Sequence, residues 1–224
     1  KEYRFGMVIR GEGLSGEIHD TDPQVTGARP LLAKAIAPEA ERTADLVNRW
    51  VSQAADILRD ERPANMVTLR GFSMDPNLPK FADVYKLKAA CVAVYPMYKG
   101  VSQLVGMDVI ETSAHDSTAD EFSRVVKQFE AGKNFVFCHI KYTDSRGEDG
   151  DFDAKVKVIE GVDQALPILL EEAKPDVLLV TGDHSTPATY KAHSWRPVPT
   201  ILWAPATHWP DRAPAFGDAS AWPA

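Results

Sequence analysis

The chain has 224 residues, a formal net charge of −7 at pH 7, and 44% hydrophobic and 25% charged residues. These values are typical of a folded protein with one large or two small domains, and the acidic balance argues against a nucleic-acid surface, which is normally basic. No apolar run approaches the roughly 20 residues of a membrane span, and the charged start at Lys1 lacks the pattern of a signal peptide. We therefore expect a cytoplasmic protein that binds neither nucleic acid nor membranes.

The first third of the chain predicts few regular elements. Residues 3–10 and 17–22 have the short apolar runs of strands, and residues 65–70 form another. Across residues 38–59, apolar side chains recur at helical spacing and define one broad face. A stretch rich in proline, glycine and polar residues at 71–80 then indicates a loop or linker, and we expect a domain boundary near residues 71–83.

From this boundary onward, strands and helices alternate. The predicted strands are 87–95, 107–111, 134–140, 176–180 and 199–203, and the predicted helices are 98–105, 120–131 and 153–172. Such alternation is typical of an α/β fold with a mostly parallel sheet flanked by helices. Cys91 and Cys138 both lie in apolar strand runs, which predicts two buried free thiols in a reducing compartment.

Acidic and imidazole side chains follow two of the predicted strands, 134–140 and 176–180. Because ligands bind beyond the carboxyl ends of strands in open α/β sheets, we expect these side chains to gather at one edge. Carboxylate and imidazole groups together suit a divalent metal such as Zn²⁺ or Mn²⁺. Five of them are enough for two ions, an arrangement that serves displacements at phosphorus. The five are Asp144, Glu148, Asp183, His184 and His193.

Each of these signals has a structural alternative. Asp144 and its acidic neighbours could form a solvated loop that caps the helix beginning at Asp153. Asp183 could cap a turn, and His193 alone could be a structural or surface residue. The combined pattern favours a metal site, because acids and imidazoles follow consecutive strands.

Two cationic side chains could bind a substrate, and two motifs of other enzyme classes are missing from the sequence. Arg70 ends a predicted strand and Lys99 precedes a glycine at a strand-to-helix turn, so either could bind a phosphate or carboxylate, or could be a plain surface cation. The run Gly11–Gly13 lacks the Gly-Lys-Ser/Thr ending of a phosphate loop. The chain also has no Gly-x-Ser-x-Gly elbow, which argues against a serine hydrolase.

Several segments together resemble a known family. The specific part is Gly-Asp-His-Ser-Thr-Pro at 182–187 followed by His-Ser at 193–194. Supporting stretches are Asp-Thr-Asp-Pro at 20–23, residues 64–71, Tyr-Lys-Gly at 98–100 with Gly-Met at 106–107, and His-Ile-Lys at 139–141 with Thr-Asp at 143–144. Over nearly the whole chain, in order, the sequence resembles the archaeal-type, cofactor-independent phosphoglycerate mutases of the alkaline phosphatase superfamily.

The resemblance implies an alkaline-phosphatase-like fold and the interconversion of 3-phosphoglycerate and 2-phosphoglycerate through a phosphoserine. It also implies two divalent ions, Mn²⁺ in the first place, with Mg²⁺, Zn²⁺ or Co²⁺ as alternatives. By motif, Asp183 and His184 would bind the ion that activates the serine, and Asp144, Glu148 and His193 the second ion; the family often has histidine where this chain has Glu148. Arg70 and Lys99 would face the substrate phosphate and carboxylate.

The resemblance further implies that the chain is a fragment. Residues 1–75 would be part of an inserted substrate domain, and residues 76–224 the C-terminal portion of the metal-binding domain. The nucleophilic serine and one aspartate ligand would lie outside the chain, so no catalytic nucleophile is assigned within it and the fragment alone is expected to be inactive. Two alternatives remain: a phosphatase or phosphonate-cleaving hydrolase on the same scaffold, and a non-catalytic module that binds a metal or ligand.

Overall fold

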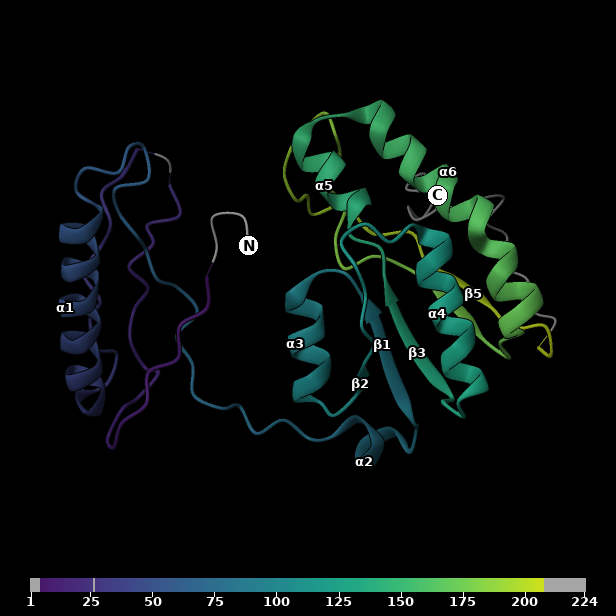
Figure 1. The fold of residues 1–224 in the computed structure, drawn as a ribbon, viewed down its shortest axis with the longest axis horizontal. Coiled ribbons are helices and arrows are strands. Elements are labelled where there is room, and N and C mark those ends of the chain that lie inside the picture. Colours follow the sequence, from purple (N-terminus) through teal and green to yellow (C-terminus); the bar gives the residue numbers. More distant parts are fainter. Residues whose placement is uncertain (1–4, 26, 208–224) are drawn as a thin grey trace. The chain divides into compact units, whose positions relative to one another are not determined.

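The computed structural model describes residues 5–25 and 27–207. The chain divides into two compact units, Lys1–Asn77 and Leu78–Ala224, each with its own core (Figure 1). Among the described residues, no helix combines the length and apolar character needed to cross a membrane.

The N-terminal unit is built on one long helix. A short 3₁₀ turn, η1 (Pro38–Ala40), leads into α1 (Glu41–Leu58), which confirms the helix predicted there. The apolar face of α1 packs on extended segments from both sides of it in the sequence, and Val47 at its centre is fully buried. The buried core of this unit consists of Ile18, Ala33, Ala40, Ala44, Val47, Val51 and Leu69.

The three strands predicted in this unit are not formed in its described part. Residues 5–10, 17–22 and 65–70 form no regular strand. Residues 17–21 nevertheless make three backbone hydrogen bonds with residues 31–36, around the bridge between Ile18 and Ala35, and buried Thr21 bonds to Leu69. A ladder needs consecutive backbone pairs with a neighbouring strand, and apolar alternation alone does not supply that neighbour.

The C-terminal unit contains a parallel sheet in the order β2-β1-β3. The central strand β1 (Ala89–Ala93) pairs with β2 (Asp108–Val109) on one side and with β3 (Phe135–His139) on the other. Helices α3 (Pro96–Leu104) and α4 (Thr118–Glu130) connect these strands, and a short helix α2 (Phe81–Tyr85) precedes them. The predicted α/β layer with a parallel sheet is confirmed.

Helices cover both faces of this sheet. Cys91 points to the α3 side, where it contacts Ser102, while its neighbour Val92 points to the other side and packs with Phe122 and Val125 of α4. Figure 1 shows α3 on one side of β1 and α4, backed by α6, on the other. All five residues of β1 are buried, which explains why this strand is a continuous apolar run rather than an alternating one.

The segment after β3 is helical, although the sequence pattern indicated no helix there and a solvated loop was one alternative for Asp144 and its neighbours. It forms helix α5 (Tyr142–Asp149), which ends at Gly150 in the left-handed conformation with φ of 76°. This helix has almost no apolar periodicity, so the pattern that reveals amphipathic helices is missing. Helix α6 (Phe152–Pro167) follows and continues as a wider π-helical turn, η2 (Ile168–Ala173), because Pro167 cannot donate the backbone bond of a regular helix.

The last two strands do not join the parallel sheet. Strand β4 (Leu178–Val180) pairs antiparallel with β5 (Ile201–Trp203) in a separate two-stranded sheet. Within the described residues, the strands at 135–139 and 178–180 therefore belong to two different sheets. Leu178 nevertheless packs against the core beneath α4, which ties β4 to the main layer.

The two cysteines are free, as predicted. Cys91 is fully buried, whereas Cys138 on the edge strand β3 is half-buried. Burial raises the pKa of both thiols, so both stay protonated and unreactive at neutral pH.

Removing a large core side chain tests the packing of α4 on the sheet. Phe122 is 5% exposed, and we expect Phe122→Ala in the full-length protein to lower the free energy of unfolding by about 3–5 kcal/mol, through lost burial and the cavity left behind. The matched control is Phe152→Ala, because Phe152 is 65% exposed; it should change stability by less than about 0.5 kcal/mol. Urea denaturation measures both, and equal effects would contradict this packing.

A buried carboxylate in α4 makes stability depend on pH. Burial, followed by the charges of Asp116 and Asp120, raises the pKa of Glu121 to about 7, although Arg124 opposes the shift. Because the unfolded carboxyl ionises near its ordinary pKa of 4.5, the folded state loses stability as pH rises from about 4.5 to 7. We expect Glu121→Gln to flatten this loss and to be relatively most stabilising above pH 7. Urea denaturation at pH 5 and pH 8 measures it, and parallel losses in both proteins would contradict the assignment.

Candidate metal centre

Helix α5 and the loop after β4 bring together all five side chains predicted to hold metal. Asp144 and Glu148 are four residues apart on α5, so they project from the same face of the helix. Asp183 and His184 follow β4 almost directly. An isolated antiparallel bridge between residues 185 and 194 folds the chain back and places His193 next to His184, where the two rings stack with centroids 3.6 Å apart.

Short interatomic distances connect the five side chains into one cluster. Oδ1 of Asp144 lies 3.9 Å from Nδ1 of His184 and 3.6 Å from Nε2 of His193. The same Nε2 lies 3.6 Å from Oε1 of Glu148, and Nε2 of His184 lies 3.5 Å from Oδ2 of Asp183. One ligand atom from each of Asp144, His184 and His193 falls within 4.8 Å of the others. Oxygen and imidazole donors at this spacing fit a divalent transition metal.

The Asp144 carboxylate is held by two donors. Burial opposes its ionisation, but the hydrogen bonds from Lys141 and Thr186 outweigh burial and lower the pKa of Asp144. The Thr186 hydroxyl donates to Oδ1 at 2.7 Å, and the Lys141 ammonium pairs with Oδ2. The carboxylate is therefore an ionised, oriented group at neutral pH, as a metal ligand must be.

The Asp183 carboxylate is held from the parallel sheet. The hydroxyl of Tyr98, on α3, donates to its Oδ2 at 2.7 Å, and the Tyr98 ring stacks on His139 at the end of β3 with centroids 3.6 Å apart. Burial opposes the ionisation of Asp183, but the bond from Tyr98 leads the interactions that outweigh it and lower the pKa of Asp183. Burial, assisted by Asp183, raises the pKa of Tyr98, so the hydroxyl keeps its proton and remains a donor.

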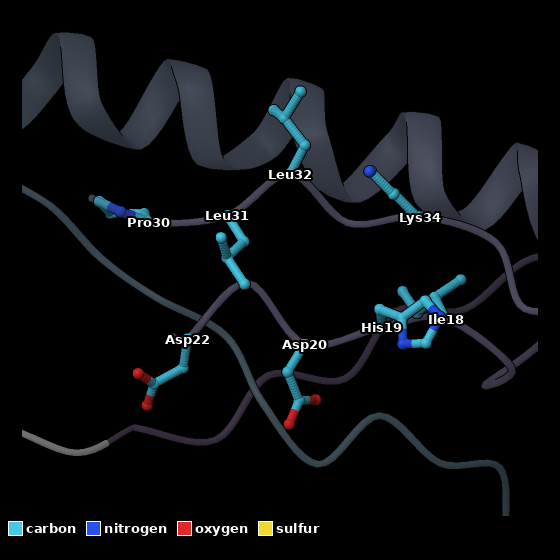
Figure 2. A pocket seen from close by; sticks show the side chains of 8 residues that line it. All are labelled: Ile18, His19, Asp20, Asp22, Pro30, Leu31, Leu32 and Lys34. Carbon is cyan, nitrogen blue, oxygen red and sulfur yellow. The ribbon is translucent and has the colours of Figure 1, made fainter. Parts of the chain in front are cut away.

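The two predicted substrate-binding cations belong to different units. Lys99 is a half-buried residue of α3 in the C-terminal unit. Arg70 is exposed in the N-terminal unit, 3.9 Å from Asp22. That unit contains a cavity of about 750 Å³ lined by Ile18, His19, Asp20, Asp22, Pro30, Leu31, Leu32 and Lys34. Figure 2 shows the carboxylates of Asp20 and Asp22 pointing to the same side of this cavity, away from Leu32, and Arg70 is thus next to its acidic wall.

Sequence reasoning missed two residues of the cluster, Thr186 and Tyr98. Thr186 stands inside the Asp-His-Ser-Thr run, two positions after His184, but a hydroxyl there has no motif chemistry of its own. Tyr98 precedes Lys99 in a segment far from the acids in sequence, and only the fold brings its hydroxyl to Asp183. Both positions stand in segments that carry the family resemblance, but the sequence alone assigns neither hydroxyl a partner.

The architecture and the donor set define a class of protein, a metalloenzyme with an α/β fold. The comparison with protein families agrees: a model described as the metalloenzyme superfamily matches residues 31–218. The chain belongs to this superfamily.

Comparison with curated proteins shows a more specific similarity, to one kind of enzyme. The chain is 50% identical over 207 residues to a probable 2,3-bisphosphoglycerate-independent phosphoglycerate mutase of Thermosipho africanus, a match that covers 92% of this chain and 50% of the relative. It is 48% identical over 204 residues to the protein of the same description from Deinococcus radiodurans, with 90% and 50% covered. The chain thus spans about half the length of the curated relatives it matches.

Solved structures show the same fold. A structure of the PH0037 protein from Pyrococcus horikoshii matches 82% of this chain and 53% of its own, with 28% identity and a TM-score of 0.72. The cofactor-independent phosphoglycerate mutase from Thermoplasma acidophilum matches 95% of this chain and 55% of its own, with 26% identity and a TM-score of 0.58. The likeness to these structures supports the fold class inferred from the sequence.

Contact between α5 and the loop after β4 leaves no room for a side chain at residue 147. A Cβ on buried Gly147 would clash with the carbonyl oxygen of Thr186 and lie 3.0 Å from its Cγ2. We expect Gly147→Ala in the full-length protein to lower the free energy of unfolding by about 1–3 kcal/mol, as overpacking does. The matched control is Gly161→Ala in α6, where a Cβ meets nothing within 4 Å; it should stabilise the helix by roughly 0.5–1 kcal/mol. Thermal unfolding compares the two, and a Gly147→Ala protein as stable as the control would contradict this close approach.

Proposed function

We propose that the full-length protein containing this chain interconverts 3-phosphoglycerate and 2-phosphoglycerate. The observation that carries the proposal is the cluster of three carboxylates and two imidazoles, formed by α5 and the loop after β4 in a chain of the metalloenzyme superfamily. The curated relatives, named as probable phosphoglycerate mutases at 45–50% identity, supply the reaction. A small phosphorylated acid is therefore the proposed substrate, and the cytoplasm remains the expected location.

The proposed cofactors are two divalent ions, Mn²⁺ in the first place, with Mg²⁺, Zn²⁺ and Co²⁺ as alternatives. We assign Asp183 and His184 to one ion and Asp144, Glu148 and His193 to the other. This division is supported by the short distance within each set, 3.5 Å between Asp183 and His184 and 3.6 Å from His193 to both acids of α5. Divalent ions would supply positive charge to activate the nucleophile and to stabilise the leaving oxygen in phosphoryl transfer.

The remaining roles follow from charge and exposure. Arg70 is the proposed ligand for a substrate phosphate or carboxylate in the N-terminal unit, since its ion pair with Asp22 is long at 3.9 Å and its side chain is 57% exposed. Lys99 is the corresponding cation in the C-terminal unit. In the proposed reaction, a serine outside this chain takes the phosphoryl group from one glycerate oxygen and returns it to the other. Residues 1–75 then serve as part of the substrate domain and 76–224 as part of the metal-binding domain.

One incubation separates this proposal from its alternatives. The full-length protein with Mn²⁺ and 3-phosphoglycerate should yield 2-phosphoglycerate, which phosphorus NMR resolves from the substrate. A phosphatase on the same scaffold would release inorganic phosphate instead, and a non-catalytic module would leave 3-phosphoglycerate unchanged. A hydrolase that cleaves carbon–phosphorus bonds would show its activity only when a phosphonate is supplied.

Removing a proposed ligand should abolish the reaction. We expect Asp183→Ala and His184→Ala in the full-length protein each to reduce mutase activity to less than a tenth, because either change takes a donor from the ion that activates the nucleophile. The matched controls are Asp163→Ala in α6 and His115→Ala, which remove an exposed acid and an exposed imidazole outside the cluster. A coupled assay of 2-phosphoglycerate formation measures all four variants. Retention of more than a tenth of the rate in either ligand variant would refute its assignment.

A further inference from the structure

The Thr186 hydroxyl lies between two candidate ligands that come from different segments. Its Oγ1 is 2.7 Å from Oδ1 of Asp144 on α5 and 3.1 Å from Nδ1 of His184 in its own loop. Thr186 is 4% exposed, so water does not compete freely for these positions. The hydroxyl is therefore the shared partner of one carboxylate and one imidazole.

A single hydrogen decides the direction of both bonds. A threonine hydroxyl has one hydrogen to donate and lone pairs to accept. An ionised carboxylate can only accept, so the hydroxyl hydrogen goes to Asp144. Two facing lone pairs would repel each other, so Nδ1 of His184 must carry a hydrogen and donate it to Thr186. In the neutral ring, the other nitrogen, Nε2, is then left with its lone pair free.

We propose that Thr186 is a positioning residue, whose hydroxyl fixes the proton of His184 on Nδ1 and holds the Asp144 carboxylate beside it. The free Nε2 lies 3.5 Å from Oδ2 of Asp183, so these two atoms face a common position. Because Nδ1 of His184 carries the hydrogen, this nitrogen cannot bind an ion together with the Asp144 carboxylate. The imidazole nitrogen nearest to that carboxylate is instead Nε2 of His193, at 3.6 Å.

This inference rests on the metal centre proposed above, but it makes a claim about the metal-free protein as well. Histidine side chains in water favour the tautomer with hydrogen on Nε2, so a ring held with hydrogen on Nδ1 needs a specific partner. Hydrogen-bond partners of metal ligands orient them, and their removal typically costs about 10–100-fold in metal affinity. Thr186 should therefore control both the tautomer of His184 and the binding of the ion.

Two measurements on the full-length protein test the role of Thr186. Proton–nitrogen correlation spectra of the metal-free protein at neutral pH, with His184 assigned through a His184→Gln variant, should show hydrogen on Nδ1. In Thr186→Val, which keeps the shape and loses the hydroxyl, His184 should shift toward the Nε2 tautomer. Calorimetric titration with Mn²⁺ should show an affinity loss of about 10–100-fold for Thr186→Val, and recovery to within about threefold in Thr186→Ser, which keeps the hydroxyl.

The matched control is Thr112→Val, which removes a half-buried threonine hydroxyl that donates to the Ala93 carbonyl oxygen at 2.6 Å. It should leave the His184 tautomer and Mn²⁺ affinity unchanged. A His184 ring that carries hydrogen on Nε2 and none on Nδ1 in the metal-free wild-type protein would overturn the proposal, and this result does not depend on any variant folding. Mn²⁺ binding by Thr186→Val equal to wild type would also overturn it. If wild-type protein binds no Mn²⁺, the proposed metal centre fails, while the tautomer still decides the role of Thr186.

Discussion

The hydrogen bond from Thr186 to Asp144 joins parts of the chain that are 42 positions apart, and the candidate site depends on this contact. Helix α5 reaches the loop after β4 only because residue 147 has no side chain; a Cβ there would meet the Thr186 backbone. This close packing places the Thr186 hydroxyl within hydrogen-bond distance of the Asp144 carboxylate. The same approach fixes the separation of two candidate ligands that come from different secondary-structure elements.

Charge is the second constraint at this site. Asp144, Glu148 and Asp183 place three carboxylates in one small cluster, and such groups repel one another when ionised. Lys141 compensates part of this charge at Asp144, and Tyr98 donates to Asp183. Two imidazoles complete the cluster with nitrogen donors. An acidic site of this kind favours divalent cations, which agrees with the chain's membership of the metalloenzyme superfamily.

The candidate ligands do not follow neighbouring strands of one parallel sheet, as the general rule for open α/β sheets would have it. Strands β3 and β4 belong to separate sheets, so their carboxyl ends are not neighbours through backbone pairing. Helix α5 and the bridge between residues 185 and 194 bring the ligands together instead. The acids and imidazoles therefore lie close together, although β3 and β4 do not share a sheet within the described residues. Their role as metal ligands stays a prediction.

The sequence by itself determined the α/β alternation, the long helix α1, the parallel strands β1 to β3 and the identity of the donor residues. These features depend on local periodicity and residue chemistry, which a single sequence displays. Only the tertiary structure decided that residues 142–149 are helical, that β4 pairs with β5, and that the described parts of the strand-like runs in the N-terminal unit form no regular strand. It alone also brought Tyr98 and Thr186 to the candidate ligands. Those outcomes depend on neighbours that are distant in sequence. A hydroxyl can position a ligand only when packing places that ligand beside it, and an extended segment becomes a strand only when packing places another strand beside it.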